Sequence, residues 1–353
     1  LRDYLKSKTK IIDLIDFSDC EIFDSATVLT NILSFKKSNH SKKCKAIRFT
    51  RKDQNRIENL ENIFKKEFVE IEEFPDSSWI VSEKSTFIIK NKIENQGVIL
   101  KDWNIKINRG ILTGLNNAFI IDFKTKEEII KIDPKSAEII KPILRGRDIK
   151  KYYYENPDLW IISTFPSKKI EIENYIGVKR FLERFGKSLE QSGEKGSRKK
   201  TNGKWFETQD SIAYWEDFEN PKIIYSELTK FLFFSFDKEK KYIDKTAFIL
   251  TGESIEYLVC FLNSSLFKFC FAHNFSEIQG NTRVLSKVIF EQIPVKQISE
   301  KEQQPFIEKV DQILSLKKDN PDADTSALER EIDLMVYALY GLSEEEIGIV
   351  ENS

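Results

Sequence analysis

The chain has 353 residues, of which 40% are hydrophobic and 12% aromatic; this is enough apolar material for a sizeable core and excludes global disorder. No stretch approaches the roughly 20 apolar residues that a membrane span requires, and no signal peptide opens the chain. The four cysteines show no CxxC spacing and there are only two histidines, which argues against a zinc site and predicts reduced thiols in the cytoplasm.

The chain opens at Leu1, and its only methionine is Met335. We therefore expect it to be a piece of a longer polypeptide. At about 100–200 residues per domain, its length predicts two or three domains.

The first 85 residues have an α/β pattern. Residues 1–8 predict a helix, and the short apolar runs at 11–15 and 45–50 predict strands. Residues 26–35 are β-branched and apolar, which predicts a buried strand. Residues 53–66 then have the spacing of a helix.

The middle of the chain is richer in turns. Residues 108–122 place glycines and asparagines between apolar residues, which predicts a hairpin rather than a helix. A helix is predicted at 170–191, followed by strands at 221–236 and 242–250. Residues 255–271 predict one amphipathic helix that is rich in phenylalanine and leucine.

The tail is predicted to be helical. Residues 302–317 and 326–340 form two helical patterns, separated by a break that contains a proline. Gly341 follows the second helix, where a C-terminus favours glycine. Ser343 and Glu346 have the spacing of a capping box for a last short helix.

Charge is segregated along the chain although the net charge is only -1. Residues 301–353 carry 5 Lys or Arg against 13 Asp or Glu, whereas residues 1–300 carry 51 against 44. The densest basic cluster, at residues 195–206 (KGSRKKTNGKWF), has five positive charges, no acid and two terminal aromatics. Such a loop can neutralise phosphates and stack an aromatic ring on a base, and the simpler alternative is a solvated surface loop.

Catalytic motifs are missing from the sequence. It contains no GxGxxG or GxxxxGK[ST] motif and no Asn-Pro-Pro-aromatic tetrapeptide of an amino-methyltransferase. The Pro75-Asp76 and Glu83-Lys84 pairs lack the spacing of a metal-dependent nuclease. On these residues alone, we interpret the chain as a binding module.

Five segments in order resemble the C-terminal half of gamma-class adenine-N6 DNA methyltransferases, including type IIG restriction–modification enzymes. Each segment alone is weak, but together they span nearly the whole chain. They are residues 1–5 with 15–17, 21–23 and 26–28, then 110–121 (GILTGLNNAFII), 143–149 (ILRGRDI), 261–264 with 293–295, and 328–342 (LEREIDLMVYALYGL).

The resemblance implies an α+β fold. A remnant of an α/β methyltransferase sheet would stand at the N-terminus, followed by a mixed α/β target recognition domain with a helical C-terminus. The implied domains are residues 1–90, 91–297 and 298–353. No catalytic residue, metal ligand or cofactor site is expected in this piece, because the cofactor glycines and the Asn-Pro-Pro-Tyr motif are absent; S-adenosylmethionine is expected for the parent.

The implied partners are double-stranded DNA and the rest of the parent polypeptide. Phe35 matches the family position whose aromatic ring packs against the flipped adenine; packing in the core is its alternative role. Arginine is the commonest specific reader of guanine, and asparagine suits adenine. The DNA-binding candidates are Arg109, Thr113, Asn116, Asn117, Arg145, Arg147, Lys195, Arg198, Lys199, Lys200, Lys204, Trp205, Asn281 and Arg283.

Two of these candidates have an equally strong competing role. Asp148 stands next to Arg147 and can pair with Arg145 or Arg147, which would make either arginine part of the scaffold. Two other functions stay open for the whole chain: a protein-interaction or regulatory module that keeps the recognition fold, and an independent nuclease.

Overall fold

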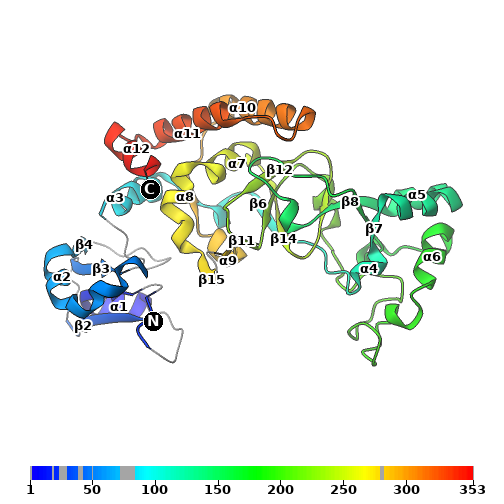
Figure 1. The fold of residues 1–353 in the computed structure, drawn as a ribbon, viewed down its shortest axis with the longest axis horizontal. Coiled ribbons are helices and arrows are strands. Elements are labelled where there is room, and N and C mark those ends of the chain that lie inside the picture. Colours follow the sequence, from blue (N-terminus) through cyan, green and yellow to red (C-terminus); the bar gives the residue numbers. More distant parts are fainter. Residues whose placement is uncertain are drawn as a thin grey trace. The chain divides into compact units, whose positions relative to one another are not determined.

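The computed structural model describes residues 2–17, 20–23, 30–38, 43–49, 51–71, 84–278 and 282–352. It forms a mixed α/β structure with several small sheets and a helical C-terminal part, and it divides into two compact units (Figure 1). Unit 1 comprises Leu1–Gly97, Phe269–Asn274 and Tyr340–Ser353, and unit 2 comprises Val98–Lys268 and Phe275–Leu339. Within the described ranges, no helix is both long and apolar enough to cross a membrane.

Unit 1 opens with a four-stranded sheet in the order β2-β1-β3-β4, in which only β1 and β3 run parallel. The predicted helix at 1–8 and the strands at 11–15 and 45–50 are confirmed. The predicted helix at 53–66 is confirmed only in its second half, because its first half is a 3-10 helix. The elements are α1 (Arg2–Lys8), β1 (Lys10–Asp16), β2 (Asn31–Lys36), β3 (Cys44–Arg48), η1 (Arg51–Asn59), α2 (Leu60–Glu67) and β4 (Val69–Ile71).

Strand β2 differs from the prediction of a buried strand at 26–35. It covers Asn31–Lys36, and all its residues are exposed or half-buried; residues 26–29 lie outside the described residues. The reason is topological, since β2 is an edge strand with β1 as its one neighbour in the sheet. Its apolar residues therefore do not lie in the interior of the sheet.

Unit 1 also contains the helices α3 (Lys84–Gln96) and α12 (Glu344–Glu351). The Lys92 Nζ lies 2.6 Å from a carboxylate oxygen of Glu346 and joins these two helices. The predicted capping box of α12 is confirmed, because the side chains of Ser343 and Glu346 each accept from the other's backbone N–H. Gly341 has a φ of +64°, the left-handed conformation that ends helices.

Unit 2 contains two four-stranded sheets. The first is antiparallel throughout and has the order β12-β10-β14-β6; the second has the order β13-β8-β9-β7. A two-stranded pair, β17-β5, and a three-stranded sheet, β11-β16-β15, complete the strands of the described part. The bounds are β5 (Val98–Ile99), β6 (Ile105–Arg109), β7 (Ile120–Asp122), β8 (Ile140–Leu144), β9 (Leu159–Ile162), β10 (Lys222–Ser226), β11 (Leu228–Thr229), β12 (Phe234–Asp237), β13 (Tyr242–Ile243), β14 (Ala247–Gly252), β15 (Ser276–Ile278), β16 (Thr282–Val284) and β17 (Pro294–Val295).

The predicted hairpin at 108–122 is wrong. Strand β6 pairs with β14 of the first sheet, whereas β7 pairs with β9 of the second. The short helix α4 (Asn116–Phe119) precedes β7. The segment therefore connects two sheets, because each of its strands has a partner from a later part of the chain.

The helices of unit 2 are shorter than predicted in two places. The helix predicted at 170–191 is only α6 (Ile176–Glu183), and the single helix predicted at 255–271 is divided at Ser264 into two helices. In contrast, both predicted tail helices are confirmed. The remaining bounds are α5 (Phe123–Ile132), α7 (Ile255–Asn263), α8 (Ser265–Phe271), α9 (Lys287–Phe290), α10 (Glu300–Asp319) and α11 (Ser326–Tyr340).

Candidate nucleic-acid interface

A pocket of about 830 Å³ opens on unit 2 beside the end of β10 and the turn that precedes β14. Its wall comes from four separate stretches of the chain, which only the fold brings together. The lining residues are Arg109, Arg145, Gly146, Arg147, Ile149, Lys150, Ser226, Glu227, Leu228, Thr229, Lys230, Phe231, Phe233, Asp244, Lys245 and Thr246.

The pocket is strongly basic, because six of its lining residues are Lys or Arg and only two are Asp or Glu. Arg109 is neutralised in part, since its guanidinium lies 2.5 Å from the Glu227 carboxylate. Arg147, Lys230 and Lys245 are exposed, and no ion pair joins their side chains to another residue of the described ranges. These three cations are therefore available to an anionic ligand.

Arg145 and Gly146 shape the wall of this pocket. The Arg145 guanidinium contacts both oxygens of Asp148, at 3.1 and 3.2 Å, and its backbone N–H donates to the same carboxylate. A Cβ on Gly146 would lie 2.7 Å from the Ser226 hydroxyl oxygen, so only glycine allows this close approach. The short 3-10 turn η4 (Gly146–Asp148) thus points Arg147 to solvent while Arg145 holds the turn.

Two aromatic residues stand among the cations. Phe231 is 62% exposed, and its ring is stacked on that of Phe233 with centroids 5.2 Å apart and an interplanar angle of 12°. Leu228 beside them is 53% exposed. These residues, like Lys230 and Lys245, are not among the candidates predicted from sequence, since no motif marks them before the strands are placed.

Arg283 lies on the sheet that borders the pocket. It is in strand β16, directly opposite Thr229 of β11, and Thr229 lines the pocket. The neighbouring candidate Asn281 lies outside the described residues. The structure therefore groups Arg109, Arg145, Arg147 and Arg283 around one pocket and its bordering sheet.

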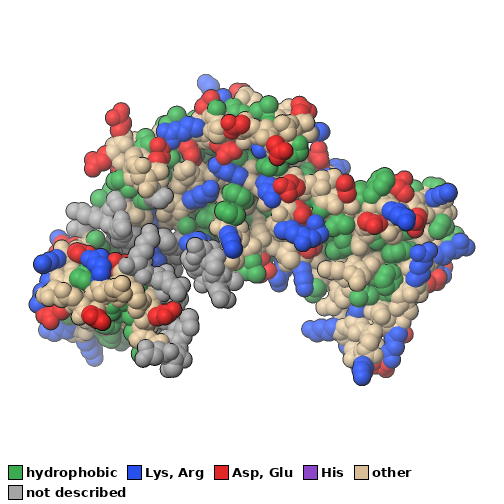
Figure 2. Space-filling view, in the orientation of Figure 1, with side chains coloured by type: hydrophobic (Ala, Val, Ile, Leu, Met, Phe, Trp, Pro, Cys, Tyr) green, Lys and Arg blue, Asp and Glu red, His purple; other side chains and the backbone are tan. Residues whose placement is uncertain are grey.

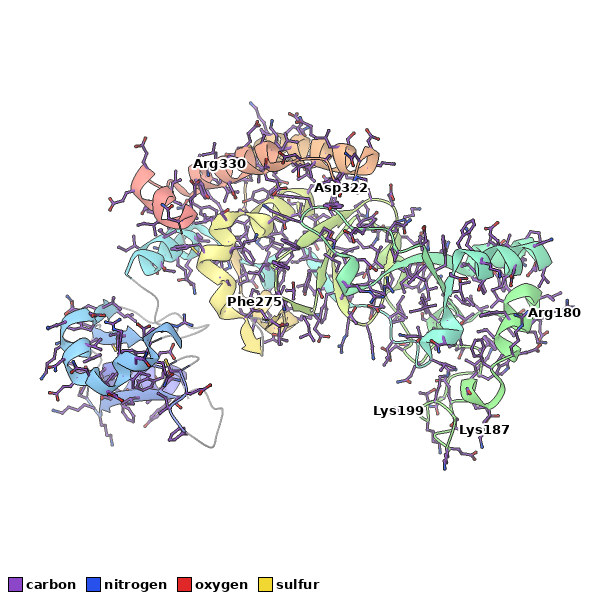
Figure 3. All side chains as sticks on the ribbon, in the orientation of Figure 1. Arg180, Lys187, Lys199, Phe275, Asp322 and Arg330 are labelled. Carbon is purple, nitrogen blue, oxygen red and sulfur yellow. The ribbon has the colours of Figure 1, made fainter. Side chains whose placement is uncertain are left out.

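The basic cluster at 195–206 forms a separate surface on another lobe of unit 2. Figure 3 shows Lys199 at the end of this lobe, and Lys195, Lys200 and Lys204 are exposed on the same loop. Figure 2 shows Lys and Arg side chains both here and over the middle of unit 2. Unit 2 therefore presents two basic surfaces.

Arg198 differs from the lysines around it because its side chain points inward. It is only 4% exposed, and its guanidinium donates to the carbonyl oxygens of Leu189, Thr113, Glu207 and Trp205 at 2.7–3.1 Å. Burial lowers its pKa to about 10, so it is charged at neutral pH. We therefore reassign Arg198 from DNA contact to the scaffold of this loop, since no donor group is left facing solvent.

The candidates at 113–117 and Trp205 border this loop. Thr113 is fully buried, and its hydroxyl donates to the Asn116 Oδ1 at 2.7 Å, which gives it a scaffold role. Asn116 and Asn117 are exposed at the start of α4. Trp205 is half-buried and packs edge-on against Phe206, with ring centroids 5.6 Å apart.

Phe35, the predicted base-stacking residue, lies in unit 1. It is 52% exposed on the edge strand β2, opposite Ile11 of β1. The alternative role in a packed core does not fit this exposure. In the part of the chain that the structure describes, no group of three or more His, Cys, Asp or Glu side chains is placed to hold a metal ion.

Part of the chain is similar to a known protein family. Residues 141–295 match the family model of the TaqI-like C-terminal specificity domain. No curated protein shows a significant match.

Solved structures that are similar to this chain include a restriction-modification enzyme and a restriction endonuclease. The type IIL restriction-modification enzyme MmeI, solved in complex with DNA, shares 13% identity at a TM-score of 0.48, covering 97% of this chain and 44% of that one. The type IIG restriction endonuclease BpuSI shares 14% identity at a TM-score of 0.45, covering 96% of this chain and 44% of that one. The HsdS subunit from Thermoanaerobacter tengcongensis shares 9% identity at a TM-score of 0.31, covering 71% of this chain and 49% of that one. The chain thus spans less than half the length of each of these proteins.

Proposed function

We propose that this chain contributes the DNA target recognition part of a restriction–modification enzyme. The observation that carries the proposal is that the basic pocket and the segment similar to a specificity domain occupy the same part of the chain. Every lining residue of the basic pocket except Arg109 falls within residues 141–295, the segment that matches a specificity domain. A specificity domain in such an enzyme has to read DNA, and a pocket with spare cations has the charge for that role.

The pocket offers both kinds of contact that a reader of duplex DNA needs. Lys230 and Lys245 suit phosphates, because an ammonium group is a compact point charge that binds without sequence preference. Arg147 suits a base edge, since its planar guanidinium matches the O6 and N7 of guanine. Arg109 and Arg145 stay paired to carboxylates and position the pocket.

The parent enzyme is proposed to be an adenine-N6 DNA methyltransferase of the type IIG class. The support is the order of the five resembling segments and the exposed aromatic at Phe35. In this proposal, S-adenosylmethionine and the catalytic Asn-Pro-Pro-Tyr motif belong to other parts of the parent, and this chain contributes DNA binding.

The salt dependence of DNA binding tests the proposal. The dissociation constant of the full chain for a fluorescent mixed-sequence duplex is measured by anisotropy over a series of salt concentrations. Each phosphate contact that is lost reduces the steepness of the plot of log K against log salt by about 0.9, where K is the association constant. We expect Lys230→Ala and Lys245→Ala each to lower the slope by about that amount.

Lys301→Ala is the matched control, because it removes the same charge from an exposed position on α10 outside the pocket. We expect it to leave the slope unchanged. Absence of salt-dependent binding by the unmodified chain would contradict the proposal and favour a protein-interaction module.

A further inference from the structure

The loop between β10 and β12 exposes a patch of apolar side chains to solvent. Its tip carries Phe231, stacked on Phe233, with Leu228 at its base, and the first and last of these are more than half exposed. Leaving a large aromatic ring in water is unfavourable, and exposed apolar patches often mark binding sites.

This loop is held in a fixed conformation. The Phe231 N–H donates to the Thr229 hydroxyl oxygen at 3.0 Å, and the Phe233 N–H donates to the Phe231 carbonyl at 2.9 Å. The Ser226 hydroxyl donates to the Leu228 carbonyl at 2.8 Å at the start of the loop. Binding through Phe231 would therefore cost little additional ordering of the backbone.

The far end of the loop is fixed by a buried amide. The Asn263 side chain, which is fully buried, accepts from the Phe234 N–H at 3.1 Å and donates to its carbonyl at 2.7 Å. Lys268 makes a cation–π contact with Phe233, since its Nζ lies over the ring, 5.5 Å from the ring centroid. Hydrogen bonds thus hold the backbone on both sides of the aromatic pair.

The charges around the aromatic pair indicate its partner. Lys230 lies between the aromatics and Leu228 in sequence, and Arg147 and Lys245 line the same pocket without an ion pair in the described ranges. Lysine is depleted in the cores of protein–protein interfaces, whereas cations beside an apolar tip suit a polyanion that also offers stacking surfaces. Duplex DNA is such a partner.

We propose that Phe231, supported by Phe233, inserts between two base pairs and partly unstacks that step while the surrounding cations hold the backbone. The inference rests on the proposed DNA-binding function and adds deformation of the duplex to it. Apolar wedges of this kind kink DNA by about 20–90° and draw it towards more of the protein surface. Specificity would then come in part from the ease with which a given step opens.

A linking-number assay tests this directly. A closed circular plasmid is relaxed by topoisomerase I in the presence of the full chain, the protein is removed, and the topoisomers are resolved on a gel. Because insertion unwinds the duplex, we expect the unmodified chain to leave negative supercoils. Phe231→Ala should remove most of this effect while the salt slope of binding stays unchanged, and Phe231→Trp should retain it.

Phe123→Ala is the matched control, since Phe123 is a similarly exposed phenylalanine on α5; it should unwind DNA as the unmodified chain does. Thermal unfolding of each variant checks that the fold is intact. If the unmodified chain binds DNA without changing the linking number, or if Phe231→Ala unwinds DNA fully, the wedge is overturned and DNA binding stands. If the unmodified chain does not bind DNA at all, the proposed function itself fails, and the wedge with it.

Discussion

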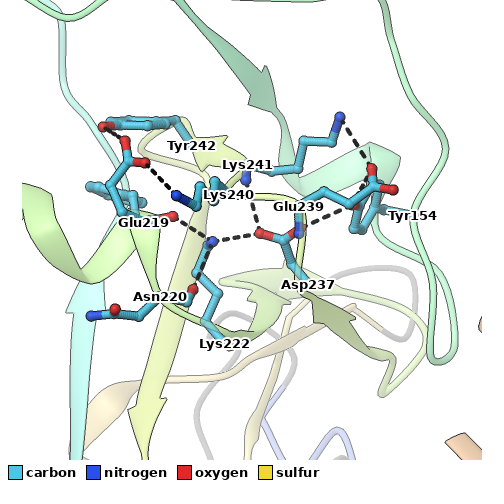
Figure 4. Close-up of polar contacts among 10 residues, drawn as sticks. Tyr154, Glu219, Asn220, Lys222, Asp237, Glu239, Lys240, Lys241 and Tyr242 are labelled. Carbon is cyan, nitrogen blue, oxygen red and sulfur yellow. Dashed lines mark hydrogen bonds and ion pairs between the residues drawn. The ribbon is translucent and has the colours of Figure 1, made fainter. Parts of the chain in front are cut away.

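Lys222 and Asp237 form an ion pair with no exposed surface on either side chain (Figure 4). The Lys222 Nζ lies 2.5 Å from the Asp237 Oδ2, between the paired strands β10 and β12, and it also donates to the Phe218 and Asn220 carbonyl oxygens. The carboxylate accepts in addition from the Tyr154 hydroxyl. Burial lowers the pKa of Lys222, and the Asp237 charge opposes this shift.

Asp237→Asn is expected to destabilise unit 2 strongly. A buried ammonium group that loses its counter-charge is left uncompensated, which typically costs about 3–5 kcal/mol of the free energy of unfolding. Urea denaturation of the variant and the unmodified chain measures the difference. Asp311→Asn is the control, because it breaks a half-exposed contact with Lys238 and should cost at most about 1 kcal/mol. Equal losses for the two variants would contradict the prediction.

Arg198→Ala is expected to loosen the loop at 189–207. The substitution leaves four carbonyl oxygens without their charged donor, and hydrogen bonds to charged groups contribute about 1.5–3 kcal/mol each. Hydrogen exchange measured by mass spectrometry should become faster across this segment. Lys199→Ala removes a neighbouring exposed charge and should leave the exchange unchanged; similar protection in both variants would show that Arg198 does not hold the loop.

The exposed lysines of the same loop are expected to contribute to DNA affinity. Replacing Lys195, Lys199, Lys200 and Lys204 by alanine should lower the slope of log K against log salt by up to about 0.9 for each lysine that contacts a phosphate. Arg198 is kept so that the loop stays folded. An unchanged slope in salt titrations would restrict the interface to the basic pocket.

Cys44 is expected to resist thiol reagents in the folded chain. Burial, and secondarily the charge of Asp13, raises the pKa of this thiol to about 12, so almost no thiolate is present at neutral pH. Between the ordinary thiol pKa of 9.0 and about 12, the folded state binds a proton that the unfolded state has released. The free energy of unfolding should therefore fall as pH rises through that window.

Two measurements check this thiol. Colour development with a thiol-specific disulfide reagent should be slow near neutral pH and rapid in denaturant, since all four cysteines are buried and none forms a disulfide. Cys44→Ala should weaken the loss of stability at high pH. Rapid labelling of Cys44 in the native chain would contradict the assignment.

The elements that were predicted best from sequence are those that depend on local chemistry. The capping box at Ser343 and Glu346 and the helix end at Gly341 need only a few neighbouring residues. The break at Ser264 combines a local cap, in which the Ser264 hydroxyl oxygen accepts from the Phe267 N–H at 3.1 Å, with a distant partner. The distant Asp333 carboxylate accepts from the Ser265 N–H at 2.8 Å and from its hydroxyl at 2.7 Å. No local pattern contains that contact.

The candidate site could be predicted only where residue type alone indicated a DNA contact. Arg109, Arg145 and Arg147 were selected because arginine is the commonest specific reader of guanine, and the pocket includes all three. Lys230 and Lys245 reach it only because β10 and β14 pair, which sequence spacing does not reveal. Arg198 shows the converse, since one arginine among exposed lysines turns inward and its sequence context is the same as theirs.

The Asn263 amide binds both backbone groups of Phe234 at the point where the exposed loop returns to the sheet. Substitutions and even insertions between β11 and Phe234 would therefore leave the hydrogen bonds of β12 in register. The tip at 230–233 can in this sense vary while the strands on both sides of it stay the same. If the proposed function holds, a change of the recognised DNA sequence would require changes at this tip but no change in the domain beneath it.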